Sequence, residues 1–367
     1  MSVSAKNKIL SVLLAGLLFG LSAFALLRPK DAYSESERRL LTQMPKISAA
    51  GLLSGSFMTE FEEYTLDQFP LREWFRTLKA LANKYLYQKS ENNGIYIRDG
   101  YYAAVQYPLD TGSLEYAAKV FNSVYDRYFA DGSCNVYFSL IPDKGYFLQE
   151  EAGQLQVDYD VLASTMREKL NRFSYIDIFP TLELADYYKT DTHWRQENLT
   201  DTADAILDGM HAEHGLQYVQ KALDVPFYGV YYGQAALPAE AESIFYLDNE
   251  LFGTLHVYDH ENRREIGVYD FEKGAGRDPY EFFLSGPLSL VTIENPNAAT
   301  ARELFVFRDS FASSLAPLLV ESYAKITLLD IRYMPSIVVG NFVQFSEGAD
   351  VLFLYSTMIL NASNVLK

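Results

Sequence analysis

Short apolar runs constrain the fold of this chain more than any other feature of its sequence. Residues 304–307 (LFVF), 326–329 (ITLL) and 351–355 (VLFLY) are almost continuously apolar. A strand with one face in water alternates apolar and polar residues, whereas a strand buried on both faces does not. A fourth run, residues 136–141, ends at Pro142. These runs predict the buried strands of a parallel sheet covered by helices on both faces.

Segments with helical periodicity separate these runs. In each segment apolar residues recur every three or four positions and so fall on one helical face. Two such faces consist of Leu114, Ala117, Phe121, Val124 and Tyr128, and of Leu199, Ala203, Ile206 and Met210. A third helix is predicted in FASSLAPLLVESYA, from about residue 311. The alternation of helix and strand predicts an α/β domain over residues 111–367.

Two other regions have a different character. Residues 219–297 are rich in tyrosine, glycine and strand-like alternation, which predicts a β-rich insertion within the α/β domain. Residues 31–110 begin with a polar connector and continue with a helical pattern that Pro70 interrupts. Turn signals follow at 93–94 (NG) and 99–100 (DG). We therefore expect residues 31–110 to form a helical and hairpin N-terminal region.

Residues 9–27 form an apolar run with basic residues on both sides. A helix needs about 20 residues to span a bilayer, so this run is about long enough. A signal peptide is the alternative, because AFA at residues 23–25 fits a cleavage site, although its apolar core usually has about 7–15 residues. We expect residues 1–30 to be a membrane anchor or a signal peptide. Both readings permit a body outside the cell, on the cell membrane or secreted, and we expect it there.

The charge and the metal-binding residue types exclude several functions. The formal net charge is −17, whereas binding to nucleic acid or to anionic lipid headgroups needs a basic face. Cys134 is the single cysteine, so the chain has no internal disulfide and no cysteine metal cluster. The pairs HAEH (211–214) and HVYDH (256–260) lack the acid-and-helix context of a zinc motif. We predict no nucleic-acid partner and no metal site.

The stretch YYKTDTHWRQE places Asp191, His193 and Trp194 just before a predicted helix. Histidine acts as a general base when a carboxylate orients its ring and a nucleophile lies within reach. Asp191 is close enough in sequence to bond the His193 ring if the backbone curls between them. The motif therefore predicts half of a catalytic site.

Ser310 is the best candidate for the nucleophile. The run at 304–307 leads directly into Arg308, Asp309 and Ser310, where the next helix is predicted to begin. Open α/β sheets bind ligands at the carboxyl ends of their strands, and a helix N-terminus favours a developing anion. The alternative is that Asp309 or Ser310 only caps the helix.

Together, KTDTHWRQE and FRDSFASSLAPLL resemble the bacterial DHHW family and the related alginate O-acetyltransferase proteins of the SGNH-hydrolase-like group. Further blocks resemble that family in the expected order: SESERRLLTQMP, FEEYTLDQFPLREWF, NNGIYI, IPDK, FYGVYY and LLDIRY. The resemblance implies a flavodoxin-like, SGNH-type α/β/α sandwich. It also implies that Ser310 is the nucleophile, His193 the base and Asp191 its orienting partner. Arg308 stands where the SGNH group usually has glycine.

The resemblance implies a function as well. It implies a serine-dependent O-acetyltransferase that acts outside the cytoplasm on a secreted or cell-wall polysaccharide and needs no cofactor. A membrane-embedded acyltransferase partner would supply the acetyl group. An esterase with the same triad and a catalytically degenerate polysaccharide-binding protein are the alternatives. Candidates for binding the substrate or its oxyanion are the Ser310 backbone N–H, Arg332, Tyr333, Trp194, Gly286 and Asp309.

Overall fold

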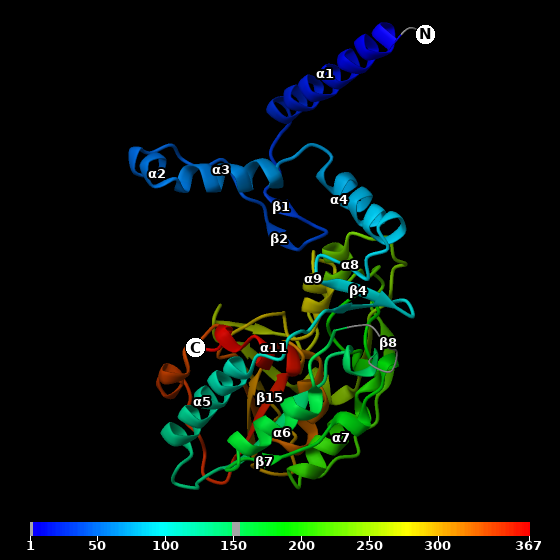
Figure 1. The fold of residues 1–367 in the computed structure, drawn as a ribbon. Coiled ribbons are helices and arrows are strands. Elements are labelled where there is room, and N and C mark those ends of the chain that lie inside the picture. The colour runs from blue at the N-terminus through cyan, green and yellow to red at the C-terminus, as the bar shows by residue number, and fades with distance from the viewer. Residues whose placement is uncertain (1–2, 149–154) are drawn as a thin grey trace. The chain divides into compact units, whose positions relative to one another are not determined.

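The computed structural model describes residues 3–148 and 155–367. The chain forms two compact units, Met1–Asn93 with Tyr232–Pro238, and Gly94–Tyr231 with Ala239–Lys367. The second unit is built around an eight-stranded sheet (Figure 1) and contains Asp191, His193 and Ser310.

The sheet of the second unit has the strand order β11-β10-β12-β14-β13-β15-β6-β7. The strands from β14 to β7 are parallel, while β12, β10 and β11 continue the sheet antiparallel beyond β14. The strands are β6 (Asn135–Ile141), β7 (Ser174–Tyr175), β10 (His256–Asp259), β11 (Arg264–Ile266), β12 (Leu290–Glu294), β13 (Glu303–Arg308), β14 (Lys325–Leu329) and β15 (Asp350–Ser356). The four apolar runs are four of the five parallel strands, as predicted.

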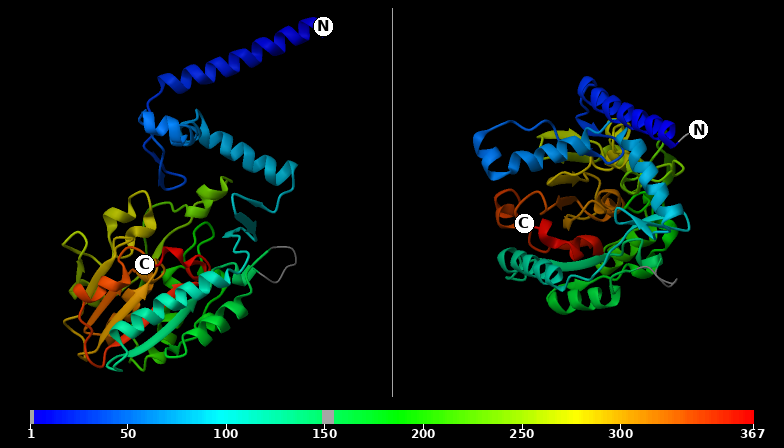
Figure 2. Two further views of the ribbon diagram at one scale, coloured as in Figure 1. Left: turned by 60° about the vertical axis from the view of Figure 1, so that its left-hand side comes forward. Right: turned by 45° about the horizontal axis from the view of Figure 1, so that its top comes forward.

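Helices cover the parallel strands on both faces. Along β13, Leu304 and Val306 belong to one hydrophobic cluster, whereas Phe305 and Phe307 belong to another on the opposite face. The first cluster includes residues of α7 (Thr200–Gly209), and the second includes residues of α5 (Thr111–Tyr128) and α6 (Tyr159–Lys169). The expected three-layer α/β/α sandwich is therefore confirmed, and Figure 2 shows it from two further directions.

The helix that follows Ser310 is shorter than the sequence predicts. α10 spans only Ala312–Leu315 and continues as a 3₁₀-helix, η8 (Ala316–Ser322). Pro317 accounts for the change, because it has no N–H to donate to the carbonyl of Ser313. A single α-helical turn has few aligned peptide dipoles, so the expected help of a helix N-terminus to an anion is small.

Residues 219–297 contribute to two sheets. β8 (Val219–Ala222) and β9 (Phe245–Asp248) pair only with each other, whereas β10 to β12 belong to the main sheet. The other short elements of the chain are α8 (Val230–Ala235), α9 (Phe271–Gly274), α11 (Thr357–Asn361), η2 (Tyr146–Leu148), η3 (Phe179–Thr181), η4 (Leu184–Asp186), η5 (Gln196–Asn198), η6 (Glu250–Thr254), η7 (Pro279–Phe282), η9 (Ser336–Asn341) and η10 (Ser363–Val365).

The hairpin predicted near residue 100 is β4 (Ile95–Arg98) and β5 (Tyr101–Ala104) of the second unit. Asp99 and Gly100, at its tip, both have left-handed backbone conformations, with φ of 49° and 81°. Asp-Gly is favoured there because a two-residue hairpin turn needs positive φ at both central positions.

The first unit begins with α1 (Val3–Leu27), a helix long and apolar enough to be a membrane span or the core of a signal peptide. Its other elements are β1 (Tyr33–Ser34), β2 (Arg39–Leu40), α2 (Ala49–Ser54), α3 (Ser56–Asp67), α4 (Arg72–Leu81), the π-helix η1 (Ala82–Leu86) and β3 (Glu91–Asn92). Pro70 lies between α3 and α4, where the sequence predicts a break. Asp67 accepts from both Nη atoms of Arg39, and these bonds hold the pKa of Asp67 well below its usual range.

Candidate active site

Asp191 and His193 lie on a loop that closes on itself. Tyr187 and Trp194 form an antiparallel bridge, and the Tyr188 N–H donates to the His193 carbonyl at 3.1 Å. Within this loop, Asp191 Oδ1 lies 3.1 Å from the His193 backbone nitrogen and 2.6 Å from ring Nδ1. The backbone curl that the motif requires is therefore present.

Ser310 comes to this loop from the carboxyl end of β13. Its Oγ lies 2.8 Å from His193 Nε2, within the range for a nucleophile and its base. Asp191 is 1% exposed, the His193 side chain is 13% exposed, and Ser310 is half-buried. The carboxylate is thus shielded from water, while Ser310 and part of the His193 side chain remain exposed.

The segment before α8 holds the Asp191 carboxylate in place. The Val230 N–H donates to Asp191 Oδ2 at 2.9 Å, and the Gly229 N–H donates to Thr190 Oγ1 at 2.9 Å. A Cβ on Gly229 would lie 2.3 Å from the backbone nitrogen of Asp191, so only glycine allows this approach. Glu242 accepts from the N–H and the hydroxyl of Thr190 at 2.8 and 2.6 Å. These contacts fix the direction of Asp191 relative to His193.

Lys144 lies behind the loop and is fully buried. Its Nζ donates to the carbonyls of Tyr188 and Lys189 at 2.6 and 3.0 Å. Burial lowers the pKa of Lys144 to about 7, although the carboxylates of Asp191 and two other residues act in the opposite direction. Lys144 therefore holds the start of the loop through two hydrogen bonds, and with a pKa of about 7 its amino group changes charge near neutral pH.

Aromatic residues support the imidazole and the serine turn. The ring of Tyr280 stacks on His193 with centroids 3.8 Å apart and planes 9° apart, and its hydroxyl lies 2.9 Å from Ser314 Oγ. Trp194 Nε1 lies 3.0 Å from the Phe311 carbonyl and 2.9 Å from Ser314 Oγ. Trp194 is fully buried, so it cannot contact a substrate as the sequence suggested. Its indole instead holds the turn that carries the serine.

Asp309 also has a different place from the one expected. Its carboxylate accepts from the backbone N–H groups of Phe311 and Ser356 at 3.0 and 2.8 Å, and the residue is 1% exposed. It therefore ties the serine turn to the end of β15 and does not face a substrate. The neighbouring Arg308 is also fully buried, with Nη1 2.9 Å from Ser313 Oγ and Nη2 3.2 Å from the Leu288 carbonyl.

The remaining candidates differ in their availability. Arg332 makes two hydrogen bonds with Asp330, from Nε at 2.9 Å and from Nη2 at 2.6 Å, so its guanidinium forms a salt bridge within the chain. Tyr333 is half exposed. Gly286 has φ of 87°, and its N–H donates to the Phe283 carbonyl at 3.2 Å, so it is not free for a substrate oxygen. Among the described residues, the backbone N–H of Ser310 has no hydrogen-bond acceptor.

Sequence reasoning missed Lys144, Gly229 and Tyr280 as parts of the site. Lys144 stands in IPDK and Gly229 in FYGVYY, two blocks that carried the family resemblance but had received no role. Tyr280 gave no signal, because a tyrosine near an Asp-Pro turn is unremarkable in a chain with 28 tyrosines. Over residues 3–148 and 155–367, no group of three His, Cys, Asp or Glu side chains is placed to hold a metal ion.

Several solved structures are similar to this chain in fold. No protein-family model and no curated protein sequence matches the chain. A DHHW family protein from Eubacterium siraeum is similar, with a TM-score of 0.62 and 21% identity over 75% of this chain and 94% of that one. PatB1 of Bacillus cereus, solved with a sulfonyl adduct, is also similar, with a TM-score of 0.58 and 18% identity over 72% and 95% of the two chains.

The O-acetyltransferase domain of Pseudomonas putida AlgJ is more distant, with a TM-score of 0.45 and 12% identity over 73% of this chain and 92% of that one. The DHHW family protein and PatB1 each align over most of their own length, so the likeness extends to their whole fold. The chain shares the α/β/α fold of the DHHW family protein and PatB1, as its sequence motifs predicted.

Proposed function

We propose that this protein is an extracytoplasmic O-acetyltransferase that modifies a secreted or cell-wall polysaccharide through an acetyl-Ser310 intermediate. The observation that supports this most is the hydrogen-bonded chain Asp191–His193–Ser310, with distances of 2.6 and 2.8 Å. Such a chain matches the requirements of nucleophilic acyl transfer in residue type, order and geometry.

The reaction follows from that geometry. The proton on His193 Nδ1 is hydrogen-bonded to the Asp191 carboxylate. His193 Nε2 then takes the proton of the Ser310 hydroxyl while Oγ attacks the carbonyl carbon of an acetyl ester. The carbon–oxygen bond of the donor then breaks, and the proton on Nε2 passes to its leaving oxygen. In the second half, Nε2 takes the proton of an acceptor hydroxyl, which attacks acetyl-Ser310. The proton returns to Ser310 Oγ as the serine leaves.

The negative oxygen of each tetrahedral intermediate needs hydrogen-bond donors. The Ser310 backbone N–H is the donor we assign, because it has no acceptor among the described residues. Tyr333 is exposed and follows the end of β14, so its hydroxyl is a further candidate for contact with the acceptor sugar. Arg332 is held by Asp330, and we assign it no direct contact.

The acetyl group and the polysaccharide rest on the family resemblance of the sequence motifs. The apolar helix α1 supports a location at or beyond the membrane. There the acetyl donor has to be delivered across the bilayer, and we propose a membrane-embedded acyltransferase as the partner that delivers it.

The first test is covalent labelling of Ser310. Wild-type protein should hydrolyse an activated acetyl ester and should gain the mass of a sulfonyl group from a sulfonyl fluoride, as the adduct in PatB1 suggests. Ser310→Ala should lose both properties. Ser164→Ala, which removes an exposed hydroxyl bonded only within its own helix, is the matched control. Equal turnover in wild type and Ser310→Ala, with no label on Ser310, would favour the degenerate polysaccharide-binding protein.

A second measurement separates transferase from esterase, since both pass through acetyl-Ser310. The acetyl-enzyme is formed from an activated ester, and acetylated oligosaccharide and free acetate are measured together. Transfer that rises with acceptor concentration while acetate release falls supports the transferase. Acetate release that is unaffected by the acceptors would favour the esterase.

A further inference from the structure

The turn between α3 and α4 in the first unit exposes three large apolar side chains. Phe69 is 40% exposed, Leu71 57% and Trp74 58%. The rings of Phe69 and Trp74 both pack edge-on against Phe75, with centroids 5.5 and 4.9 Å away. We call Phe69, Leu71 and Trp74 the apolar corner. Contiguous exposed apolar groups of this kind mark surfaces that contact a protein or a membrane.

Leu71 has a backbone conformation that favours glycine. Its φ is 57° and its ψ 30°, in the left-handed region that leucine rarely adopts. Leu71 remains exposed, so burial of its side chain does not stabilise this conformation. A strained, exposed leucine indicates that the corner serves something outside the folded chain.

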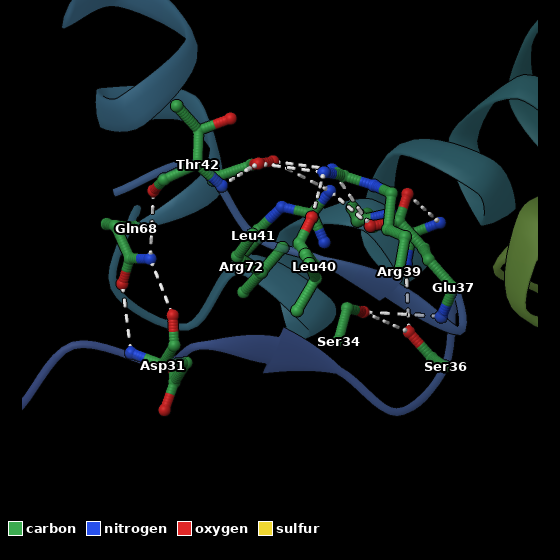
Figure 3. Close-up of polar contacts among 12 residues, drawn as sticks. Asp31, Ser34, Ser36, Glu37, Arg39, Leu40, Leu41, Thr42, Gln68 and Arg72 are labelled. Carbon is green, nitrogen blue, oxygen red and sulfur yellow. Dashed lines mark hydrogen bonds and ion pairs between the residues drawn. The ribbon is translucent and has the colours of Figure 1, made fainter. Parts of the chain in front are cut away.

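Hydrogen bonds tie the corner to the end of α1. Gln68, which precedes Phe69, exchanges two hydrogen bonds with the backbone of Asp31, at 3.1 and 2.8 Å, and these are visible in Figure 3. Arg28, the residue after α1, donates from Nη2 to the Gln68 carbonyl at 3.4 Å. Gln68 is nearly fully buried. The corner is thus fastened within one residue of the C-terminal end of α1.

The corner also reaches back along α1. Phe24, which precedes the end of α1 by three residues, lines the same open pocket of about 590 Å³ as Phe69, Leu71 and Trp74. At 1.5 Å per residue, Phe24 lies about 4.5 Å inside the end of the helix. The apolar run 9–27 of α1 spans about 28 Å at that rise, which matches the roughly 30 Å of bilayer hydrocarbon, so the end of α1 that precedes Arg28 falls at the interface. The corner lies at that same depth.

We propose that the apolar corner is a second membrane contact, which inserts into the interfacial layer of the bilayer beside α1. Tryptophan favours this layer, because its ring is apolar and its N–H is polar. The charged residues that line the pocket include Arg28 and Arg72 but also Asp31 and Glu73, so attraction to anionic lipid is not the basis of the contact. Zwitterionic phospholipid is the occupant.

The two tryptophans of the chain make the contact measurable, because Trp194 is fully buried. Full-length protein is reconstituted in phosphatidylcholine bilayers, and emission from Trp74 is obtained by subtracting that of Trp74→Phe. Phosphatidylcholine brominated on its acyl chains should remove most of the Trp74 emission, whereas iodide in the water should remove little. Quenching by iodide without quenching by brominated lipid would overturn the proposal. So would protein from membranes whose mass shows that α1 has been removed.

A tryptophan elsewhere in the same unit provides the control. Tyr87 is 66% exposed and directly follows η1, fifteen residues beyond Arg72. In a Trp74→Phe background, Tyr87→Trp should be quenched by iodide and not by brominated lipid. If brominated lipid quenches Tyr87→Trp as strongly as Trp74, the contact does not belong to the corner and the assignment is wrong.

Discussion

Replacing Asp191 by asparagine tests the proposed mechanism with an almost isosteric change. Asp191 Oδ1 faces the Nδ1 and the backbone nitrogen of His193, and Oδ2 faces the Val230 N–H at 2.9 Å. An amide has one oxygen and one NH₂ group, so it cannot accept on both sides. With its oxygen toward His193, its NH₂ group opposes the Val230 N–H. With its oxygen toward Val230, its NH₂ group faces Nδ1 and favours a proton on Nε2, which cannot then take the Ser310 proton.

Both orientations carry a cost that can be estimated. Leaving the half-buried Val230 N–H without an acceptor costs at most about 1–3 kcal/mol of folding stability. Forcing the wrong tautomer lowers turnover by about 10⁴-fold when a triad aspartate is changed to asparagine. That factor is about 5.5 kcal/mol of activation free energy at 25 °C. The folding loss is smaller than the roughly 5–15 kcal/mol by which native proteins are stable, so Asp191→Asn should fold, and the tautomer loss should leave it nearly inactive.

The assay is hydrolysis of an activated acetyl ester, with unfolding by denaturant measured on the same samples. Asp309→Asn is the matched control, since Asp309 is equally buried and accepts from two backbone N–H groups but touches no imidazole. It should lose similar stability and at most about tenfold in turnover, or about 1.4 kcal/mol. If Asp191→Asn keeps more turnover than Asp309→Asn, the assignment of Asp191 as the group that orients His193 is refuted.

Three further substitutions test the support of the site. The pKa of Lys144 is about 7 in the folded protein and near 10.5 when unfolded, so the unfolded chain binds more protons between those values and stability should rise with pH there. Lys144→Met should abolish that rise in denaturant unfolding from pH 6 to 9, and an unchanged slope would contradict the assignment. Gly229→Ala should lose most ester hydrolysis because its Cβ meets backbone at 2.3 Å, whereas Gly253→Ala, with open space around it, should match wild type. Tyr280→Phe keeps the ring on His193 and should keep more turnover than Tyr280→Leu; equal rates would show that the stacking has no role.

The parallel part of the sheet could be predicted because its strands are buried on both faces, and such strands have almost continuously apolar sequences. The antiparallel extension by β12, β10 and β11 could not, because alternation along a strand indicates an exposed face but not which strand lies beside it. The length of the helix after Ser310 was overestimated, although Pro317 was visible in the sequence. The prediction rested on the spacing of the apolar residues and gave no weight to the proline. In the structure Pro317 has no N–H to donate, and the α-helix continues as a 3₁₀-helix.

The site was predictable to the extent that its chemistry is local. Asp191 and His193 are two residues apart, and Ser310 follows a strand whose end can be read from the sequence. Ser310 and His193 are 117 positions apart in the sequence. Their contact depends on how β13 and the loop pack together, which no local sequence pattern encodes. Gly229 and Tyr280 join the site only through the path of the chain between residues 219 and 297. Their roles needed the folded structure.

Arg308 shows why a departure from a family pattern need not damage a site. Glycine is required in a tight turn where φ is positive or where a side chain would collide. Arg308, Asp309 and Ser310 all have negative φ, so the turn itself accepts any side chain. The arginine side chain is buried, where Nη1 bonds the Ser313 hydroxyl and approaches the Asp309 carbonyl at 3.4 Å, one on each side of Ser310. Arg308 therefore supports the nucleophile turn from within the core, while the carboxylate of Asp309 bonds the turn to the end of β15.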